Sequence, residues 1–575
     1  MKNRILLFTI LITSQIFAQE TKYPQTDFVA PVNIPMYLSG TFGEMRGNHF
    51  HSGIDIKTNG SEGIPIIAIA DGYVSRIKVS PGGFGKALYI KHPNGYSSVY
   101  AHLQRFSDDI QQYVTKNQYK EESFAVNLFP KAKVFQVKQG DTIAVSGNTG
   151  SSLGPHLHFE IRESETETPV NPLFFNFAVR DYVRPRISAL KIYPYDHMSQ
   201  VDGKNEALKL AVAGWGEKHR LEKEKLHAVS GNIYFGIDVD DQLNDMPNRN
   251  GVYSVELFVD STLVYSTEME KFSFYETRYI NSLIDYAEYT STKSHFQKTF
   301  VEPNNELSIY RRVENDGIVS FSDSSMHQIE YVIKDLYGNV SKLHFELKSL
   351  PPDSSRISYE LEEGMLFNHV IQNEFVSGDF KLKADPRSFY NSFFFKYDIM
   401  NTLKPIDKLY SKIHSIHDES IAIHKWIDIS IRVDSIPEGS EDKLLVVKLS
   451  DDLEFEAAGG TFKEGWMHTG IRDFGNYAVV LDTVPPKIEA LNIYENKNIK
   501  NMQAIRIKIT DELSGISGYK PTLNGKWILM EYDPKNDLLL YSPDNMLKKG
   551  KNTFKLEVWD ERGNRSERKL TLFNK

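Results

Sequence analysis

The sequence predicts a mainly β protein, with an N-terminal antiparallel β-sheet domain followed by β-sandwich modules. Three observations support this prediction. Short runs rich in Val, Ile and Tyr alternate with polar residues between about residues 37 and 161. Hairpin-turn dipeptides, Asp71-Gly72 and Asn94-Gly95, separate some of these runs. Further along the chain, longer stretches with the same alternation occur twice in similar sequence.

Composition narrows the classes of protein and of site. The chain has 575 residues and no cysteine, which is long enough for several domains. Disulfides, thiolate nucleophiles and cysteine-ligated zinc or iron–sulfur sites are therefore excluded, and any metal has to be held by His, Asp or Glu. The net charge is −9 and no Lys/Arg-rich block is present, so we do not expect nucleic acid as a partner.

The first residues are predicted to be an export signal. Lys2 and Arg4 form a positive start, residues 5–17 are mostly apolar, and Ala18 supplies the small residue before a cut ahead of Gln19. The apolar stretch is short for a bilayer of ~30 Å; an uncleaved N-terminal membrane anchor is the alternative. We therefore expect an exported protein, periplasmic or secreted, without stable membrane insertion.

One helix is expected to interrupt the β pattern of the first domain. Ser107 is a plausible N-cap, and Asp108 and Asp109 suit a first helical turn. The apolar residues that follow at helical spacing are Ile110, Tyr113 and Val114. This helix is the centre of an insertion at about 104–136.

An internal repeat organises the rest of the chain. Residues 183–194 match 484–495, and residues 329–347 match 554–572 with a shared Asp-x-x-Gly-Asn hairpin. Alternating strands around such a hairpin favour immunoglobulin-like β-sandwiches, and Pro-Pro pairs mark boundaries. The predicted units are a signal peptide (1–18), the N-terminal β domain (19–183), a β-sandwich (184–350), a β-rich domain of uncertain type (351–483) and a second β-sandwich (484–575).

Two His-x-x-x-Asp motifs occur among the 17 histidines. His414 and Asp418 lie in a polar stretch without turn residues, which favours ordinary surface. His51 and Asp55 would lie ~13 Å apart in an extended strand, too far to share a metal. Gly53 between them permits the bend that would bring them together.

A His-x-His motif completes a candidate metal site. The glycines and Pro155 predict a loop that enters a strand at His156, so His156 and His158 point to the same face of the sheet. His102 ends another predicted strand of that sheet. Two histidines and one carboxylate make an open zinc site whose fourth position holds water.

At these residues the chain resembles the lysostaphin/LytM-type zinc metallopeptidases. The motifs "HSGIDI", "ADGYV", "YAHL" and "GNTGSSLGPHLHFEIR" occur in the order of that family over about residues 37–175. The resemblance implies that one Zn²⁺ is bound by the two histidines and the aspartate of the motifs, namely His51, Asp55 and His158.

By the same resemblance, His102 and His156 are the catalytic histidines that do not bind the metal. Which of the two is the general base stays open. His49 has no role in the family pattern. Glu160 is expected to point outward from His158 by strand alternation and to be structural.

The resemblance also implies a function. The expected activity is a zinc metalloendopeptidase that cuts peptide cross-links of bacterial peptidoglycan, at a D-alanyl–diaminopimelate bond or at a glycine bridge. The alternative is a non-catalytic scaffold that activates other wall hydrolases, although relatives of that kind have lost ligands and all five positions are intact here. The C-terminal sandwiches could be spacers, wall-binding arms, an autoinhibitory lid or a docking site for a protein partner.

Two further sequence features bear on the site. Residues 150–154 satisfy the Gly-x-Ser-x-Gly pattern of serine hydrolases, but a nucleophile elbow needs a following helix and Pro155 leads into a strand. The insertion begins and ends near catalytic histidines in sequence, so we expect it to form a wall or lid of the groove; surface decoration is the alternative.

Overall fold

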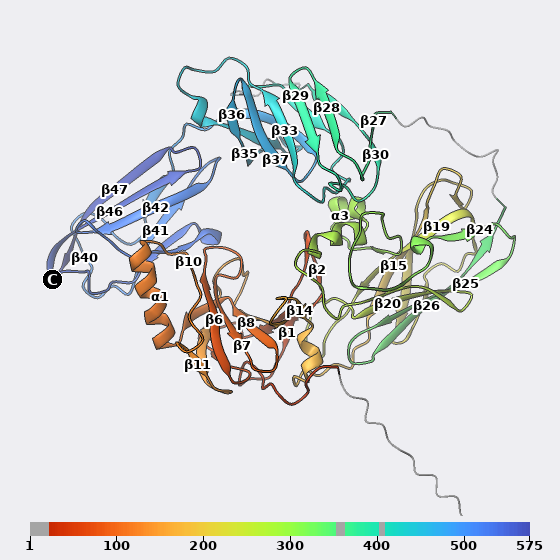
Figure 1. Ribbon diagram of the computed structural model, residues 1–575, viewed down its shortest axis with the longest axis horizontal. Helices are drawn as coiled ribbons and strands as arrows, with labels where there is room; N and C mark the ends of the chain where they lie inside the picture. The colour runs from red at the N-terminus through yellow and green to blue at the C-terminus, as the bar shows by residue number, and fades with distance from the viewer. Residues whose placement is uncertain (1–21, 352–362, 402–408) are drawn as a thin grey trace, which may run out of the picture.

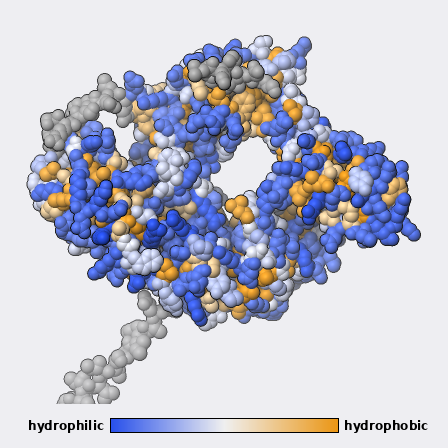
Figure 2. Space-filling view, turned by 180° about the vertical axis from the view of Figure 1, so that it is seen from behind, coloured by the Kyte–Doolittle hydropathy of each residue, from blue (hydrophilic) through white to orange (hydrophobic). Residues whose placement is uncertain are grey.

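The computed structural model describes residues 22–351, 363–401 and 409–575. The predicted signal peptide, 1–18, lies outside the described residues. The predicted fold class is confirmed, because the described chain is mainly β and forms four β-rich bodies that follow one another around a ring (Figure 1). Seen from behind, the four bodies leave an opening through the molecule (Figure 2). Within the described residues, no helix combines the length and apolarity needed to cross a bilayer.

The N-terminal body is built on one large antiparallel sheet. Its strands run in the order β1-β4-β13-β8-β7-β6-β10, with β11 on β6 and β14 on β13. A second sheet, β5-β12-β9, and a hairpin of β2 and β3 accompany it. The bounds are β1 (Leu38–Gly40), β2 (Met45–Arg46), β3 (His49–Phe50), β4 (Ile54–Lys57), β5 (Pro65–Ile67), β6 (Gly72–Val79), β7 (Lys86–Lys91), β8 (Tyr96–Ala101), β9 (Leu103–Phe106), β10 (Val126–Leu128), β11 (Gln136–Val137), β12 (Thr142–Ser146), β13 (His156–Glu163) and β14 (Pro169–Val170).

The predicted helix is present as α1 (Asp108–Glu121), with Ser107 at its N-cap. Ile110 and Val114 are buried against the β domain, which joins the helix to the same apolar core as β13 and β8. The far end of α1 contacts the last body of the chain. There Tyr119 hydrogen-bonds Asp544 and packs edge-on against Trp527.

The second body is a β-sandwich with a helical excursion. In its long sheet, β18 and β19 pair in parallel with β26, while the other pairings are antiparallel. The excursion carries α2 (Ile280–Leu283) and α3 (Tyr286–Thr292). The strands are β15 (Arg186–Pro194), β16 (Gln200–Val201), β17 (Leu208–Trp215), β18 (Lys218–Leu221), β19 (His227–Asp240), β20 (Ser254–Val259), β21 (Thr262–Glu268), β22 (Gln297–Lys298), β23 (Tyr310–Val313), β24 (Val319–Phe321), β25 (Met326–Lys334) and β26 (Val340–Ser349).

The third body packs two five-stranded sheets, β28-β29-β33-β37-β36 and β31-β32-β38-β34-β35, with β27 paired to β30 beside them. The strands are β27 (Met365–Phe367), β28 (Asn373–Ser377), β29 (Phe380–Ala384), β30 (Phe393–Phe395), β31 (Tyr397–Met400), β32 (Ile413–Ile416), β33 (Ile427–Arg432), β34 (Leu444–Leu449), β35 (Phe455–Gly459), β36 (Thr461–Lys463), β37 (Trp466–Ile471) and β38 (Gly475–Leu481).

The fourth body is the second sandwich, with sheets β39-β41-β45-β44 and β40-β47-β46-β42-β43. A 3-10 turn, η6 (Pro534–Asn536), follows β44. The strands are β39 (Lys487–Ala490), β40 (Lys497–Asn498), β41 (Ile505–Thr510), β42 (Ile516–Leu523), β43 (Lys526–Trp527), β44 (Glu531–Asp533), β45 (Leu538–Tyr541), β46 (Gly550–Asp560) and β47 (Arg565–Asn574). The domain boundaries given above stay a prediction.

Each body has its own apolar core, and a further cluster joins residues of the first, second and third bodies. Phe42 and Phe50, which flank the β2–β3 hairpin, pack on Phe272 of the second body with ring centroids 4.8 and 5.3 Å away. Tyr390 of the third body belongs to the same cluster. The hairpin that leads to His51 is therefore supported by residues more than two hundred positions downstream.

Candidate metal centre

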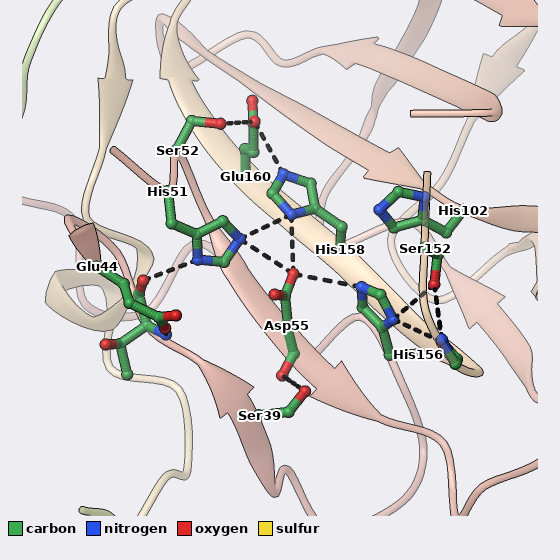
Figure 3. Close-up of polar contacts among 12 residues, drawn as sticks. Ser39, Glu44, His51, Ser52, Asp55, His102, Ser152, His156, His158 and Glu160 are labelled. Carbon is green, nitrogen blue, oxygen red and sulfur yellow. Dashed lines mark hydrogen bonds and ion pairs between the residues drawn. The ribbon is translucent and has the colours of Figure 1, made fainter. Parts of the chain in front are cut away.

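Three buried side chains converge on one point, two from neighbouring strands of the main sheet and one from the segment that follows the β2–β3 hairpin (Figure 3). Asp55 on β4 lies directly opposite His158 on β13 in the antiparallel register, and cross-strand partners on one face are in contact. Asp55 Oδ1 lies 3.0 Å from His51 Nε2 and 2.9 Å from His158 Nδ1, and the two nitrogens are 3.0 Å apart. The three residues that the motifs singled out therefore form a group that could hold a metal ion.

His51 reaches this point through a tight approach of the backbone. A Cβ on Gly53 would lie 2.3 Å from the carbonyl oxygen of Phe159, so only glycine lets the chain between His51 and Asp55 press against β13. On the other side, His51 Nδ1 lies 2.8 Å from the carbonyl oxygen of Thr41. Because a carbonyl only accepts, Nδ1 carries the hydrogen and the lone pair of Nε2 faces the cluster.

His158 is oriented in the same way by a carboxylate. Its Nε2 donates to Glu160 Oε1 at 2.9 Å, which leaves the lone pair of Nδ1 facing Asp55. Glu160 is fully buried and is held in turn by Ser52 and Arg162. The expectation that Glu160 points outward is wrong: residues two apart in a strand share a face, so Glu160 lies behind the ring of His158.

The donor atoms fit a cation. When both histidines are neutral, two imidazole lone pairs and one carboxylate oxygen face each other at about hydrogen-bond distance, which is unfavourable unless a proton or a metal ion lies among them. Burial lowers the pKa of His158, but Asp55 and Glu160 outweigh it and raise that pKa to about 9. Burial also opposes ionisation of Asp55, yet the histidines hold its pKa well below the usual range. The pocket therefore favours positive charge at this point.

The other two predicted histidines lie beside the cluster. His156 begins β13, as predicted, and His102 directly follows β8 in a left-handed conformation with φ of 58°. Their ring centroids are 4.8 Å apart. His102 Nδ1 donates to the carbonyl of Thr149 at 2.9 Å and His156 Nδ1 to that of Gly154 at 2.8 Å. Each ring therefore keeps an Nε2 lone pair, and burial, with repulsion from the neighbouring histidines, lowers the pKa of His102 to about 3.

A groove of about 830 Å³ opens over these residues. Arg46 lines it and donates to the second oxygen of Asp55 at 2.7 Å. The lining residues are Tyr37, Ser39, Arg46, Asp55, Lys57, Asn59, Gly60, His102, Ser151, Ser152, Leu153, Gly154, Pro155, His156 and Met246. Met246 comes from the second body, so the groove is shared between bodies. No local pattern pointed to Arg46 or Met246, because Arg46 lies in the two-residue strand β2, which is too short to show a period, and Met246 lies on the connection between β19 and β20.

The insertion does not line this groove, so the predicted lid is not found there. Its helix faces the fourth body instead, through Tyr119. Residues 150–154 form a loop that leads into β13 without a following helix, as expected for a serine-hydrolase decoy. The prediction that His414 is surface is wrong: it is fully buried in β32 and contacts the hydroxyl of Tyr397 at 2.8 Å.

Comparison with known proteins agrees with the site. Residues 49–119 and 131–172 match the model of peptidase family M23, and residues 364–482 match that of a Zu5-like domain. The chain therefore contains an M23 (LytM-type) domain, as predicted, and the third body, whose type was uncertain, matches the Zu5-like description.

Three curated relatives each match about a fifth to a quarter of the chain. An uncharacterized metalloprotease of Haemophilus influenzae is 36% identical over 123 residues, 21% of this chain and 20% of the relative. The DD-carboxypeptidase/endopeptidase Mpg of Neisseria meningitidis is 35% identical over 21% of this chain and 22% of the relative. The murein hydrolase activator NlpD of Escherichia coli is 37% identical over 23% of this chain and 27% of the relative. The chain thus spans about a quarter or less of the length of these relatives.

Two solved structures are each similar to about a quarter of the chain. The catalytic domain of the prophage-encoded M23 protein EnpA from Enterococcus faecalis is 26% identical, covering 25% of this chain and 95% of that domain with a TM-score of 0.19. The catalytic domain of lysostaphin from Staphylococcus simulans is 24% identical, covering 24% of this chain and 92% of that domain, also with a TM-score of 0.19.

Proposed function

We propose that this protein is an exported zinc-dependent endopeptidase that hydrolyses peptide cross-links of bacterial peptidoglycan. The observation that carries the proposal is the convergence of His51 Nε2, Asp55 Oδ1 and His158 Nδ1 on one point, within reach of two further histidines. Supporting it, an endopeptidase and an activator of wall hydrolysis are among the relatives of the M23 domain.

In this proposal His51, Asp55 and His158 hold one zinc ion. When bound, zinc supplies Lewis-acid chemistry: it polarises a carbonyl and lowers the pKa of water. Glu160 and the carbonyl of Thr41 fix the two ligand rings, so the donor set is formed before the metal arrives.

His102 and His156 move the proton. Their Nδ1 atoms are committed to backbone carbonyls, so each presents an Nε2 lone pair to the groove. The histidine that acts as general base takes a proton from the attacking water at Nε2 and then, as the protonated ring, passes that proton to the leaving amine. While protonated, the ring also stabilises the oxyanion of the tetrahedral intermediate. His156 has two contacts that His102 lacks: its Nδ1 lies 3.1 Å from Ser152 Oγ and its Nε2 lies 3.5 Å from Asp55 Oδ1. These contacts do not assign the proton transfer, so the general base stays open between the two histidines.

The groove favours a peptide that carries a carboxylate. Arg46 and Lys57 supply cationic groups along it and Tyr37 an aromatic surface. A D-alanyl–diaminopimelate cross-link offers a free carboxylate beside the scissile bond, whereas a glycine bridge offers none. We therefore place the diaminopimelate type of cross-link first.

The test is digestion of purified wall by the mature protein, with products identified by mass. We expect cross-linked peptides to be cut, the activity to disappear with a chelator and return with zinc, and the His158→Ala protein to be inactive and to hold no zinc. The competing role is the activator. Full zinc binding with no released peptide, together with stimulation of a separate wall hydrolase, would favour it and reject the peptidase.

A further inference from the structure

Both β-sandwiches carry a group of three aspartates at the end where the chain enters. Asp181, Asp241 and Asp335 form the group in the second body, and Asp482, Asp511 and Asp560 form it in the fourth. In each group one oxygen per residue lies within 4.8 Å of the others. Neither group belongs to the M23 domain or to its groove.

The two groups occupy equivalent places in the fold. Asp181 lies five residues before β15 begins, and Asp482 lies five before β39. Asp241 directly follows Asp240, which pairs with Arg186 at the start of β15. In the same way, Asp511 directly follows Thr510, which pairs with Lys487 at the start of β39. The third member of each group opens the turn of the Asp-x-x-Gly-Asn hairpin.

The hydrogen bonds around the two hairpins also agree. Asn339 donates its backbone N–H to Asp335 Oδ1 at 2.8 Å, and its side chain donates to Asp335 Oδ2 and to the carbonyl of Asp181. Asn564 makes the same three bonds, to both oxygens of Asp560 and to the carbonyl of Asp482. The repeat thus preserves a three-dimensional arrangement and not only a sequence pattern.

Unpartnered oxygens in the first group point to a missing ligand. Asp181 and Asp241 are each 4% exposed. Within the described residues, no hydrogen bond reaches Asp181 Oδ2 or Asp241 Oδ1. Asn250 pairs with Asp241 in an isolated bridge and is 3% exposed, and its side-chain amide likewise has no hydrogen-bond partner among these residues. A buried carboxylate oxygen without a partner is strongly unfavourable.

The negative charges of the first group, Asp181, Asp241 and Asp335, also have no counter-charge in the described part of the chain. No salt bridge from Lys, Arg or His to Asp181, Asp241 or Asp335 is present among the described residues. Burial, followed by repulsion from the other two carboxylates, raises the pKa of Asp241 to about 8. A cation among the three oxygens removes this repulsion and satisfies the orphaned atoms together.

We propose that each sandwich binds one calcium ion, held by Asp181, Asp241 and Asp335 in the second body and by Asp482, Asp511 and Asp560 in the fourth. Because all the donor atoms are carboxylate oxygens, the sites do not favour the softer transition metals. Three converging carboxylates favour Ca²⁺ over Mg²⁺, since Mg²⁺ keeps several waters and usually takes one or two carboxylates.

The position of the sites gives them a mechanical role. Asp181 lies on the segment that joins the M23 domain to the second body, and Asp482 on the segment that joins the third body to the fourth. An ion at each site ties this segment to the hairpin turn of the sandwich that follows. Calcium therefore fixes the direction in which each sandwich leaves its predecessor.

The test is calorimetric titration of the full chain with CaCl2, after treatment with a calcium-selective chelator and with zinc restored. We expect two ions per chain, with dissociation constants in about the 10⁻⁴–10⁻³ M range of extracellular calcium modules. Asp241→Asn and Asp511→Asn should each remove one ion and the double variant both. Asp109→Asn, at the exposed start of α1, is the matched control and should keep two.

Thermal unfolding separates metal binding from simple repulsion. Calcium should raise the Tm of the native chain, and the double variant should lose that rise while folding normally without calcium, because Asn removes charge at constant shape. MgCl2 should give a smaller rise. Absence of binding at millimolar CaCl2, a stoichiometry unchanged by both substitutions, or equal affinity for magnesium would each overturn the proposal. His158→Ala, which lacks the zinc site, should leave the calcium stoichiometry at two.

Discussion

Each imidazole of the candidate centre has one ring nitrogen that faces the metal site or the groove. The other nitrogen makes a hydrogen bond that orients the ring. His51 and His102 use backbone carbonyls, whereas His158 uses the carboxylate of Glu160. A carbonyl fixes the tautomer of the ring without adding charge. A carboxylate also makes the ring more basic, and so a stronger metal ligand. The contact behind each ring therefore sets its tautomer, and the carboxylate of Glu160 distinguishes His158 from the other two.

His102→Ala should retain zinc and lose about 10²–10⁴-fold in rate, the usual range for a general acid–base group. The reason is that its Nδ1 is committed to Thr149 and its ring is not among the converging donors. Zinc content and kcat, measured on one preparation, check this. Asp55→Ala is the contrasting variant and should lose metal and activity together; loss of zinc in His102→Ala would instead make His102 a ligand.

Glu160→Gln should weaken zinc binding by about 10–100-fold, as is usual when a carboxylate behind a ligand histidine is lost. The amide keeps the shape but removes the charge that supports His158. Competition with a chromophoric chelator measures the affinity, and a melting curve checks that the Arg162 side chain is tolerated without its partner. The exposed Glu165→Gln is the control; equal affinity in the two variants would contradict the role of Glu160.

At the residue scale, the strand period decided what could be predicted. His156 and His158 follow an i, i+2 rule, and Asp55 was reachable once Gly53 allowed the bend. By the same i, i+2 rule Glu160 shares a face with His158, so the prediction that it points outward was a wrong use of the rule. Arg46 could not be found, because its position depends on the hairpin of β2 and β3 folding back over Asp55, and no local pattern encodes that contact.

At the scale of elements, the β2–β3 hairpin is the part of the site with the least support of its own. Two strands of two residues each cannot be stable alone. Phe42 and Phe50 bury their rings against Phe272, and the backbone N–H of Phe50 donates to Thr277 at 2.7 Å. The second body therefore supports part of the metal site, which the sequence could not reveal, since the partners are so far apart in the chain.

Phe272→Ala should lower stability by about 3–5 kcal/mol, the usual cost of truncating a buried phenylalanine, and should also weaken zinc binding because the hairpin loses its support. Phe235→Ala, fully buried in the core of the second body, is the matched control. We expect both variants to melt earlier but only Phe272→Ala to lose zinc affinity at a temperature where both are folded. Unchanged affinity in Phe272→Ala would show that the hairpin holds without the second body.

Over the whole molecule, the ring is closed by contacts between the first and the fourth body. Lys86 on β7 is buried and pairs with Glu531 on β44 at 2.8 Å. Lys535 in η6 donates to the carbonyl of Ser152 at 2.9 Å, in the loop that lines the groove. The sequence predicted both bodies but not their contact, because it depends on the orientation of three successive linkers.

Closure of the ring should depend on the Lys86–Glu531 pair. Glu531→Gln removes the counter-charge of the Lys86 ammonium and leaves it with the carbonyl of Gln104. Because the charge-assisted hydrogen bonds between the two bodies are then weaker, the fourth body should detach more often. Hydrogen exchange followed by mass spectrometry should then be faster in α1, in residues 148–154 and in residues 527–541, and unchanged in β15 and β19. Glu557→Gln removes a charge from the same body at the exposed pair with Lys555 and is the control. If exchange in α1 and in residues 148–154 is the same for both variants, the ring is not held by this contact, and the fourth body has no mechanical link to the groove through it.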